Sequence, residues 1–325
     1  MPRSSFLTGL HAAFGVPRAV VVGVAQRATG GEVADVQRVV RGYDNEVYRV
    51  RLANDSIVYV RIRRPGPRGF YQEAWAMAQA RSVDVPVPEV LSIEVVSSED
   101  GDREAMVTEQ APGGQLEDIL PSLSPLQRHA AMVEVGRVLA MVHSVRTAGV
   151  WRPGEDGVWP DPVALRYGFI ADRRAEDVQL SAAGLTADEI RRTVALLGAS
   201  PDTPPQSEFV LCHGDPTPEH VFVDGHLRVT GFIDWGMWHG GSPIGELARV
   251  AAHYEEVDFG SILVGHGAGS LDDPGFRRAI SLSIVNQEVG HIAFHVSIGD
   301  AEGAARNVAV LRRALNELRG GRIEE

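Results

Sequence analysis

The chain has 325 residues, of which 44% are hydrophobic and 23% charged, and its formal net charge at pH 7 is −12. This composition is typical of a folded protein with one large or two modest domains and excludes a disordered chain. The acidic balance also argues against a nucleic-acid partner, because phosphate backbones require a basic face.

The first part of the chain is predicted to form a small antiparallel sheet that carries one helix. Segments rich in Val, Ile and Tyr, separated by turn-like residues, predict strands. The predicted strands are 36–40, 46–52, 56–63 and 105–109. A helix is predicted at 71–81, followed by an extended segment at 85–88.

After residue 113 the hydrophobic period changes from two residues to about 3.6, which indicates helices. Capping boxes at Ser124–Gln127 and Thr186–Glu189 mark two helix starts, and Gly198 marks the end of the second helix. Later helices are predicted at 243–257, 276–297 and 301–318. Short strands are predicted at 209–212, 221–224 and 228–233, and a loop at 151–162.

These elements predict an α+β, bilobal fold with a β-rich lobe at residues 1–112, a hinge at about 108–113 and a larger helical lobe at 113–325. The smaller lobe has a net charge of −1 and the larger one a net charge of −11. Solubility is the simpler explanation of this asymmetry, and attraction of a cationic ligand is the alternative.

Three further features restrict location and chemistry. No apolar run reaches the ~18 residues that a membrane-spanning helix needs, and the N-terminus lacks the pattern of a secretory signal. The single cysteine, Cys212, is expected to be a small core residue in a cytoplasmic protein without membrane contact. All 31 basic residues are arginine, which excludes mechanisms that need an active-site lysine.

The residues with the strongest chemical signal are two acids that follow predicted strands. Asp215 stands in His213-Gly214-Asp215, His220 follows five residues later, and Asp234 ends the predicted hairpin. Phosphoryl transfer requires one carboxylate to orient and deprotonate the attacking hydroxyl, and others to hold Mg²⁺ against the phosphate oxygens. Two other functions stay open on these residues alone: a metal-dependent phosphohydrolase and a nucleotide-binding protein without catalytic activity.

The segments around His213–His220 and Asp234 resemble the catalytic loop and metal-binding segment of the aminoglycoside phosphotransferase family, whose pattern is H-G-D-x-x-x-x-N followed by I-D-W. The resemblance implies a protein-kinase-like fold, Asp215 as the catalytic base, Asp234 as the main Mg²⁺ ligand and His213 as a structural residue. His220 stands where the family usually has its metal-binding asparagine. The macrolide phosphotransferase branch also carries histidine there, so His220 is expected to bind the metal more weakly or through water.

The strand at 56–63 resembles the family's strand that carries a phosphate-binding lysine. Period-two alternation places Tyr59, Arg61 and Arg63 on one face, and Arg61 takes the position of that lysine. A guanidinium supplies the same charge with bidentate geometry. Glu73, on the following helix, resembles the glutamate that pairs with this cation.

Two segments resemble the remaining parts of a nucleotide site. Gly42 and Asn45 lie in a segment similar to the loop that covers the phosphates. The segment 107–113 resembles the hinge, in which the Glu109 carbonyl and the Ala111 amide would bind the purine edge. Gly241–Ala248 resembles the family's G-D-P-x-x-D-L-A segment, with serine and glutamate in place of its two aspartates.

The resemblance implies a small-molecule kinase that uses Mg²⁺ and transfers the γ-phosphate of ATP or GTP to a hydroxyl group. The expected acceptor is an antibiotic or related natural product of macrolide or aminoglycoside type, and the acidic larger lobe favours a cationic one. Metabolic alcohols similar to homoserine or choline are the alternative acceptors. The sequence does not distinguish ATP from GTP.

Overall fold

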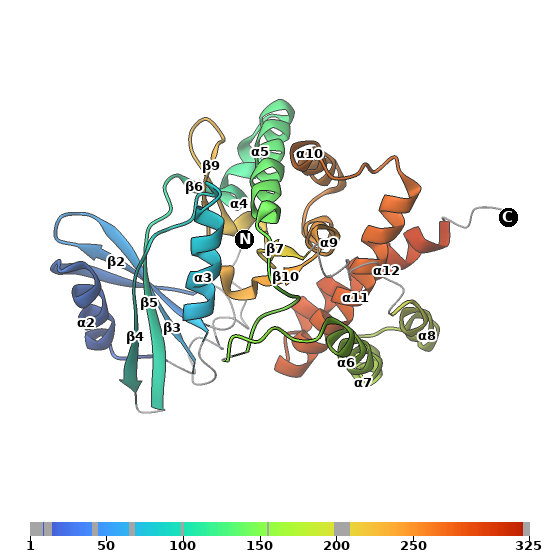
Figure 1. The fold of residues 1–325 in the computed structure, drawn as a ribbon, viewed down its shortest axis with the longest axis horizontal. Helices are drawn as coiled ribbons and strands as arrows, with labels where there is room; N and C mark the ends of the chain where they lie inside the picture. The colour runs from blue at the N-terminus through green and yellow to red at the C-terminus, as the bar shows by residue number, and fades with distance from the viewer. Residues whose placement is uncertain are drawn as a thin grey trace.

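The structure is a computed structural model that describes residues 9, 15–40, 45–64, 69–98, 101–154, 156–197 and 209–320. Its N-terminal part is a five-stranded antiparallel sheet with the strand order β1-β2-β3-β5-β4. The elements here are α2 (Arg18–Thr29), β1 (Val33–Val39), β2 (Asn45–Leu52), β3 (Ile57–Arg63), α3 (Phe70–Arg81), β4 (Val90–Ser98) and β5 (Gly101–Glu109). Figure 1 shows this sheet at one end of the molecule, with the helices of the C-terminal part at the other.

The C-terminal part is mainly helical and contains two small sheets, β7 with β10 and β6-β8-β9. Its first elements are β6 (Gly114–Gln115), α4 (Leu116–Ile119), η1 (Leu120–Ser122), α5 (Pro125–Ser144), α6 (Pro162–Arg174), α7 (Asp177–Ala182) and α8 (Ala187–Leu196). Next come β7 (Val210–Cys212), η3 (Pro218–His220), β8 (Val221–Val223), β9 (Val229–Phe232), η4 (Trp235–Met237) and β10 (His239–Gly241). The last elements are α9 (Pro243–His253), α10 (Glu256–His266), α11 (Pro274–Ile298) and α12 (Ala301–Gly320).

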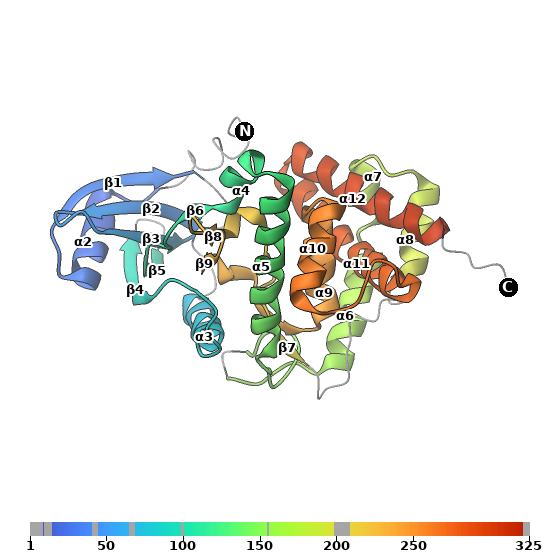
Figure 2. The same ribbon diagram turned by 90° about the horizontal axis from the view of Figure 1, so that it is seen from above.

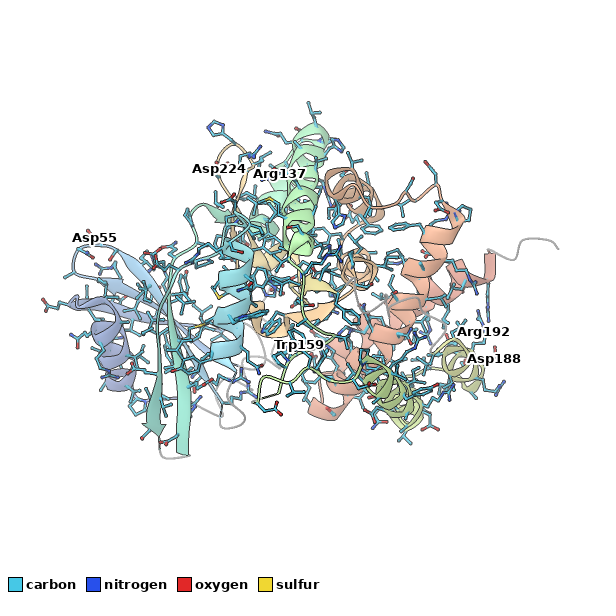
Figure 3. The ribbon with its side chains drawn as sticks, viewed as in Figure 1. Asp55, Arg137, Trp159, Asp188, Arg192 and Asp224 are labelled. Atoms are coloured by element: carbon cyan, nitrogen blue, oxygen red, sulfur yellow. The ribbon has the colours of Figure 1, made fainter. Side chains whose placement is uncertain are left out.

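The predicted α+β class, with a β-rich N-terminal part and a helical C-terminal part, is therefore confirmed. Figure 3 labels Asp55, at the turn between β2 and β3, and Asp188, on α8, which lie toward opposite ends of the long axis. Within the described residues, no helix is both long and apolar enough to span a membrane.

The strongest local sequence signals are reproduced. Both capping boxes form: the Ser124 and Thr186 side chains accept hydrogen bonds from the backbone of Gln127 and Glu189, whose side chains bond back to the cap residues. In β3 every second residue is buried, so Arg61 lies on the face opposite Val60 and Ile62. Gly198 lies outside the described residues.

The predictions were incomplete or wrong at several elements. Helix α2 and strand β4 were not predicted, nor were α6, α7 and α10. The helix predicted at 243–257 ends at His253, because the chain becomes extended at Tyr254. The buried Tyr254 hydroxyl there donates a hydrogen bond to the Pro216 carbonyl, a tertiary contact that local sequence does not reveal.

Two hydrophobic cores hold the fold together. The smaller core joins α2 to one face of the N-terminal sheet. The larger core fills the helical part and also includes Ala76, Met77 and Ala80 of α3. Helix α3 therefore packs with the C-terminal elements, and it lies between the sheet and the helices (Figure 2).

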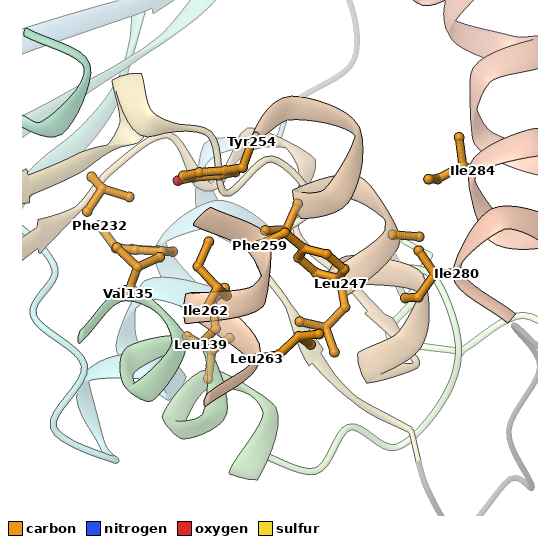
Figure 4. Packing of buried hydrophobic residues seen from close by; sticks show 14 of the residues in the cluster. Val135, Leu139, Phe232, Leu247, Tyr254, Phe259, Ile262, Leu263, Ile280 and Ile284 are labelled. Atoms are coloured by element: carbon orange, nitrogen blue, oxygen red, sulfur yellow. The ribbon is translucent and has the colours of Figure 1, made fainter. Parts of the chain in front are cut away.

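Close packing of α5 against α10 fixes the centre of the larger core (Figure 4). A Cβ atom at Gly136 would lie 2.0 Å from the Ile262 carbonyl oxygen, and one at Gly265 would lie 1.9 Å from that of Val133. Only glycine allows two helix backbones to approach so closely. Helix α5 thereby becomes a rigid support for β7 and the loop that follows it.

Candidate active site

The loop after β7 carries Asp215 and is shaped by Gly214. Gly214 has φ +87°, in the left-handed region that favours glycine. A Cβ atom there would also lie 2.0 Å from the Met237 carbonyl oxygen. The sequence His-Gly-Asp thus turns sharply at the end of the strand and brings the loop against the segment that follows Asp234.

His213 is fully buried and fixes this loop to the neighbouring hairpin. Its Nε2 donates a 2.9 Å hydrogen bond to the Ile233 carbonyl, and its Nδ1 accepts one of 3.2 Å from the Asp215 amide. Burial lowers the pKa of His213, in agreement with the neutral tautomer that these two bonds require. The ring therefore connects the two segments that carry Asp215 and Asp234.

Glu246, on α9, binds the backbone of the loop that follows β7. Its carboxylate accepts hydrogen bonds from the backbone amides of His213 (3.1 Å) and Gly214 (2.6 Å) and from His143 Nε2 (2.7 Å). Burial alone would raise the pKa of Glu246, but the hydrogen bond and charge of His143 outweigh it and lower the pKa to about 2. Glutamate at the position of the family's second aspartate therefore still supports the loop.

Cys212 is buried, as predicted. Its Sγ lies near His143 and Glu246, with ligand atoms of the three residues all within 4.8 Å of one another. The Glu246 oxygens already accept three hydrogen bonds, so this group forms part of the support for the loop.

The Asp215 carboxylate lies between the guanidinium of Arg249 and the imidazole ring of His220. Its Oδ1 accepts a 3.1 Å hydrogen bond from Arg249 Nη2, and its Oδ2 lies 3.5 Å from His220 Nδ1. Burial works against ionisation, but the charges of Arg249 and His220 prevail and lower the pKa of Asp215. Asp215 is therefore an ionised carboxylate with a side chain still 22% exposed.

Asp234 follows β9 and has the left-handed backbone conformation φ 61°, ψ 63°, which aspartate tolerates better than most residues. Its Oδ1 accepts a 2.9 Å hydrogen bond from Arg61 Nη2. The other terminal nitrogen of Arg61 donates to Glu73, which is 2% exposed. The predicted pair of Arg61 and Glu73 is therefore present, and it contacts the hairpin acid directly.

His220 lies between the two acids. Its Nδ1 donates a 2.8 Å hydrogen bond to the Asp215 carbonyl, and its Nε2 lies 3.7 Å from Asp234 Oδ2. Desolvation opposes the charged ring, but Asp234 and Asp215 prevail and raise the pKa of His220. The structure thus gathers Asp215, His220, Asp234, Arg61 and Glu73 into one site.

These residues fit a magnesium ion that is bound together with nucleotide phosphates. Proteins commonly hold Mg²⁺ through one or two carboxylates, with phosphates and water completing the octahedron. The Asp234 side chain is 45% exposed, and its Oδ2 faces the Nε2 edge of His220. Imidazole nitrogen is a poorer Mg²⁺ ligand than amide oxygen, so Asp234 is the stronger donor of the two.

The remaining predicted nucleotide residues lie at the edges of this region. Asn45 begins β2, beside Arg63 of β3. Glu109 ends β5, and Ala111 lies just beyond it, buried against Gly231 of β9. Gly42 lies outside the described residues. Their contacts with a nucleotide stay predictions.

Two arginines near the site were not identified from the sequence. Arg249 contacts Asp215, as described above. Arg152, in the loop before α6, donates hydrogen bonds to the carbonyls of Gly236 and Trp238 and thus ties down the segment after Asp234. Neither arginine was marked by a distinguishing pattern: Arg249 shares its helix face with Glu246 and His253, and Arg152 lies in a loop.

The histidines spaced four apart on α11 do not share a site. His291 contacts Glu288 and Arg249, whereas His295 contacts Asp300. The two rings therefore have separate partners and do not act as a pair of zinc ligands.

The sheet, the connecting α3 and the paired acids define the class of a protein-kinase-like phosphotransferase. A model of the family described as "Phosphotransferase enzyme family" matches residues 35–280, which is more than half of the chain. The chain belongs to this family, and it is a small-molecule phosphotransferase. No curated protein matches it closely enough in sequence to count as a relative.

Solved structures with the same fold share little sequence identity with the chain. A thermostable mutant of aminoglycoside phosphotransferase APH(4)-Ia is 18% identical, with a TM-score of 0.70 over 93% of this chain and 100% of that one. A candidate fructosamine-3-kinase from Thermobifida fusca is 21% identical, with a TM-score of 0.63 over 94% and 100%. Macrolide 2'-phosphotransferase MphH from Brachybacterium faecium is 18% identical, with a TM-score of 0.54 over 95% and 100%.

Proposed function

We propose that the chain transfers the γ-phosphate of ATP or GTP to a hydroxyl group of an antibiotic or related natural product, and thereby inactivates it. The observation that carries this proposal is the meeting of Asp215 and Asp234 on opposite edges of His220, with Arg61 and Glu73 alongside. This combination supplies a base, a metal ligand and a phosphate-binding cation in one place.

In the proposed reaction the acceptor oxygen attacks the γ-phosphorus and its proton passes to Asp215. The bond between the γ-phosphorus and the bridging oxygen breaks, and the nucleoside diphosphate leaves. Arg61, oriented by Glu73, binds the phosphates. Asp234, with His220, would hold Mg²⁺, which neutralises charge on the β- and γ-phosphate oxygens when it is bound.

The two lobes would divide this work at a hinge near residues 108–113. Residues 1–112 would bind the nucleotide, with Glu109 and Ala111 at the purine edge and Asn45 near the phosphates. Residues 113–325 would carry the base and the acceptor site. Helix α3 links the two parts, because it presents Glu73 to Arg61 while packing in the larger core.

The acceptor class rests on the family and on two sequence features. His220 favours a macrolide-type acceptor, since that branch also carries histidine at this position. The excess negative charge of residues 113–325 favours an acceptor that bears an amine, as macrolides and aminoglycosides do. The complex of an APH(4)-Ia variant with ADP and hygromycin B supports an antibiotic of this general kind.

A panel assay tests the proposal. ADP or GDP release would be measured with MgATP or MgGTP and, in turn, a macrolide, an aminoglycoside, homoserine and choline. We expect turnover with an antibiotic well above the rate without acceptor. Phosphorylation of homoserine or choline alone would overturn the antibiotic assignment and leave a metabolic kinase.

A metal-dependent phosphohydrolase is the second candidate, because Asp215, His220 and Asp234 lie close together, although both ring nitrogens of the neighbouring His213 are already engaged in hydrogen bonds. Such an enzyme would release phosphate from a phosphate ester without needing a nucleotide. Metal analysis that finds a tightly held transition metal in a protein unable to bind MgATP would support it.

A further inference from the structure

Arg249 connects Asp215 to a buried acid on another helix. One end of its guanidinium, Nη2, donates to Asp215 Oδ1 at 3.1 Å. The other end, Nη1, lies 3.1 Å from His291 Nδ1 and 4.0 Å from Glu288 Oε1. The Arg249 side chain is only 17% exposed, so this bridge from α11 through α9 to the loop is largely shielded from water.

Glu288 requires a cationic partner in this position. It is 1% exposed, and a buried carboxylate is costly unless it is paired. Its Oε1 lies near His291 and Arg249, while its Oε2 has no hydrogen-bond partner among the described residues. The permanent positive charge of Arg249 lies between the carboxylates of Glu288 and Asp215 and stabilises both. The two acids together therefore determine where the guanidinium lies.

The neighbouring histidine does not replace Arg249. Desolvation and the charge of Arg249 lower the pKa of His253 to about 4, so His253 is neutral at neutral pH and contributes no cation. On its other side, Oδ2 of Asp215 lies 3.5 Å from His220 Nδ1. Arg249 thus holds Oδ1 at hydrogen-bonding distance and leaves Oδ2 as the oxygen that can receive a proton.

We propose that Arg249, held at its other end by His291 and by the charge of the buried Glu288, is a positioning residue that fixes the Asp215 carboxylate for the transfer reaction. This inference rests on the proposed function, because it gives Asp215 the role of base. A planar guanidinium can hold two acids at once in a fixed geometry, whereas a lysine ammonium is a flexible point charge. Displacing a catalytic group by about 1 Å can cost about 10²-fold in rate.

The test compares Arg249→Gln, Arg249→Lys and Glu288→Gln with wild type, using ADP release from MgATP alone and with each acceptor of the panel. We expect Arg249→Gln to lower kcat about 10²-fold while the KM for MgATP stays within about 2-fold, because the nucleotide side of the site is untouched. Arg249→Lys should retain more activity than Arg249→Gln. Glu288→Gln should also lower kcat, since it removes the buried negative charge that faces Arg249.

Two controls separate positioning from general loosening of α9. Arg313, an exposed residue of α12, donates a hydrogen bond to the carbonyl of Ala251 on α9. The variant Arg313→Gln removes this contact and should leave kcat unchanged. Millimolar guanidinium should restore part of the activity of Arg249→Ala and none of that of Asp215→Ala. Melting curves should show that each variant folds.

The outcomes distinguish this inference from the function on which it rests. The positioning role is wrong, and the proposed function stands, if wild type is active and Arg249→Gln keeps the wild-type kcat. The same conclusion follows if Arg249→Gln lowers kcat and raises the nucleotide KM in parallel and guanidinium does not rescue Arg249→Ala. If wild type releases no ADP with or without any acceptor, the proposed function fails, and this inference fails with it.

Discussion

Replacing Glu246 with glutamine tests how the catalytic loop is supported. The pKa of Glu246 falls from its ordinary value of 4.5 to about 2 in the folded protein. One pKa unit corresponds to about 1.4 kcal/mol, so the ionised carboxylate contributes about 3 kcal/mol to stability at neutral pH. Glutamine would also point an N–H₂ group at an amide or histidine donor and leave that buried donor without an acceptor.

We therefore expect Glu246→Gln to lower the free energy of unfolding by about 3 kcal/mol and the melting temperature by roughly 5 °C or more. The effect depends on pH in a defined direction. Because the folded pKa is depressed, the contribution of Glu246 is fully present above pH 4.5 and is lost as the pH falls toward 2. The difference between wild type and variant should therefore shrink in acid. Turnover should fall as well, because the backbone amides of His213 and Gly214, which precede Asp215, lose a charged acceptor.

Glu189→Gln is the matched control. The pKa of Glu189 is also lowered to about 2, first by its hydrogen bond with Arg312, but the Arg312 side chain is 45% exposed. Exposed ion pairs contribute at most about 1 kcal/mol, and glutamine still completes the capping box. Equal losses in the two variants, or a Glu246→Gln protein as stable as wild type at pH 7, would refute the reasoning.

Two further predictions concern the same site. Arg61→Ala should raise the KM for nucleotide by about 10-fold or more, as expected for loss of a charged phosphate contact worth ~1.5–3 kcal/mol, whereas Arg61→Lys should retain most of the affinity. Steady-state kinetics with MgATP measure both variants, and equal KM values in wild type and Arg61→Ala would contradict the role of Arg61 in phosphate binding. Gly214→Ala places a Cβ atom 2.0 Å from the Met237 carbonyl oxygen at φ +87°, so it should lower both the melting temperature and kcat; a fully active, equally stable variant would show that the loop tolerates another conformation.

Sequence reasoning succeeded where the determining interactions are local. The capping boxes at Ser124 and Thr186 involve residues three apart, and the alternation that places Arg61 on the face opposite Val60 follows from the pleat of a strand. The loop after β7, which turns sharply at Gly214, was predicted because His213, Gly214 and Asp215 are contiguous. Each of these patterns is complete within a few residues.

The sequence was less informative where distant residues meet. Arg249 and Glu288 lie on α9 and α11 and become partners only through the packing of those helices. Likewise, α9 ends where Tyr254 reaches Pro216 in the catalytic loop. The sequence showed Glu246 only as a glutamate in place of the family's second aspartate. Its fit depends on His143 of α5, which is more than one hundred residues away in sequence.

The most direct test of the account is to measure nucleotide binding and turnover separately in Asp215→Ala and Asp234→Ala. Calorimetry with MgATP should find nearly unchanged affinity in Asp215→Ala, whose kcat falls by ~10² or more, and no Mg²⁺-dependent binding in Asp234→Ala. If Asp234→Ala bound MgATP as wild type does, or if both variants kept wild-type turnover, the two acids could not share one metal–nucleotide site.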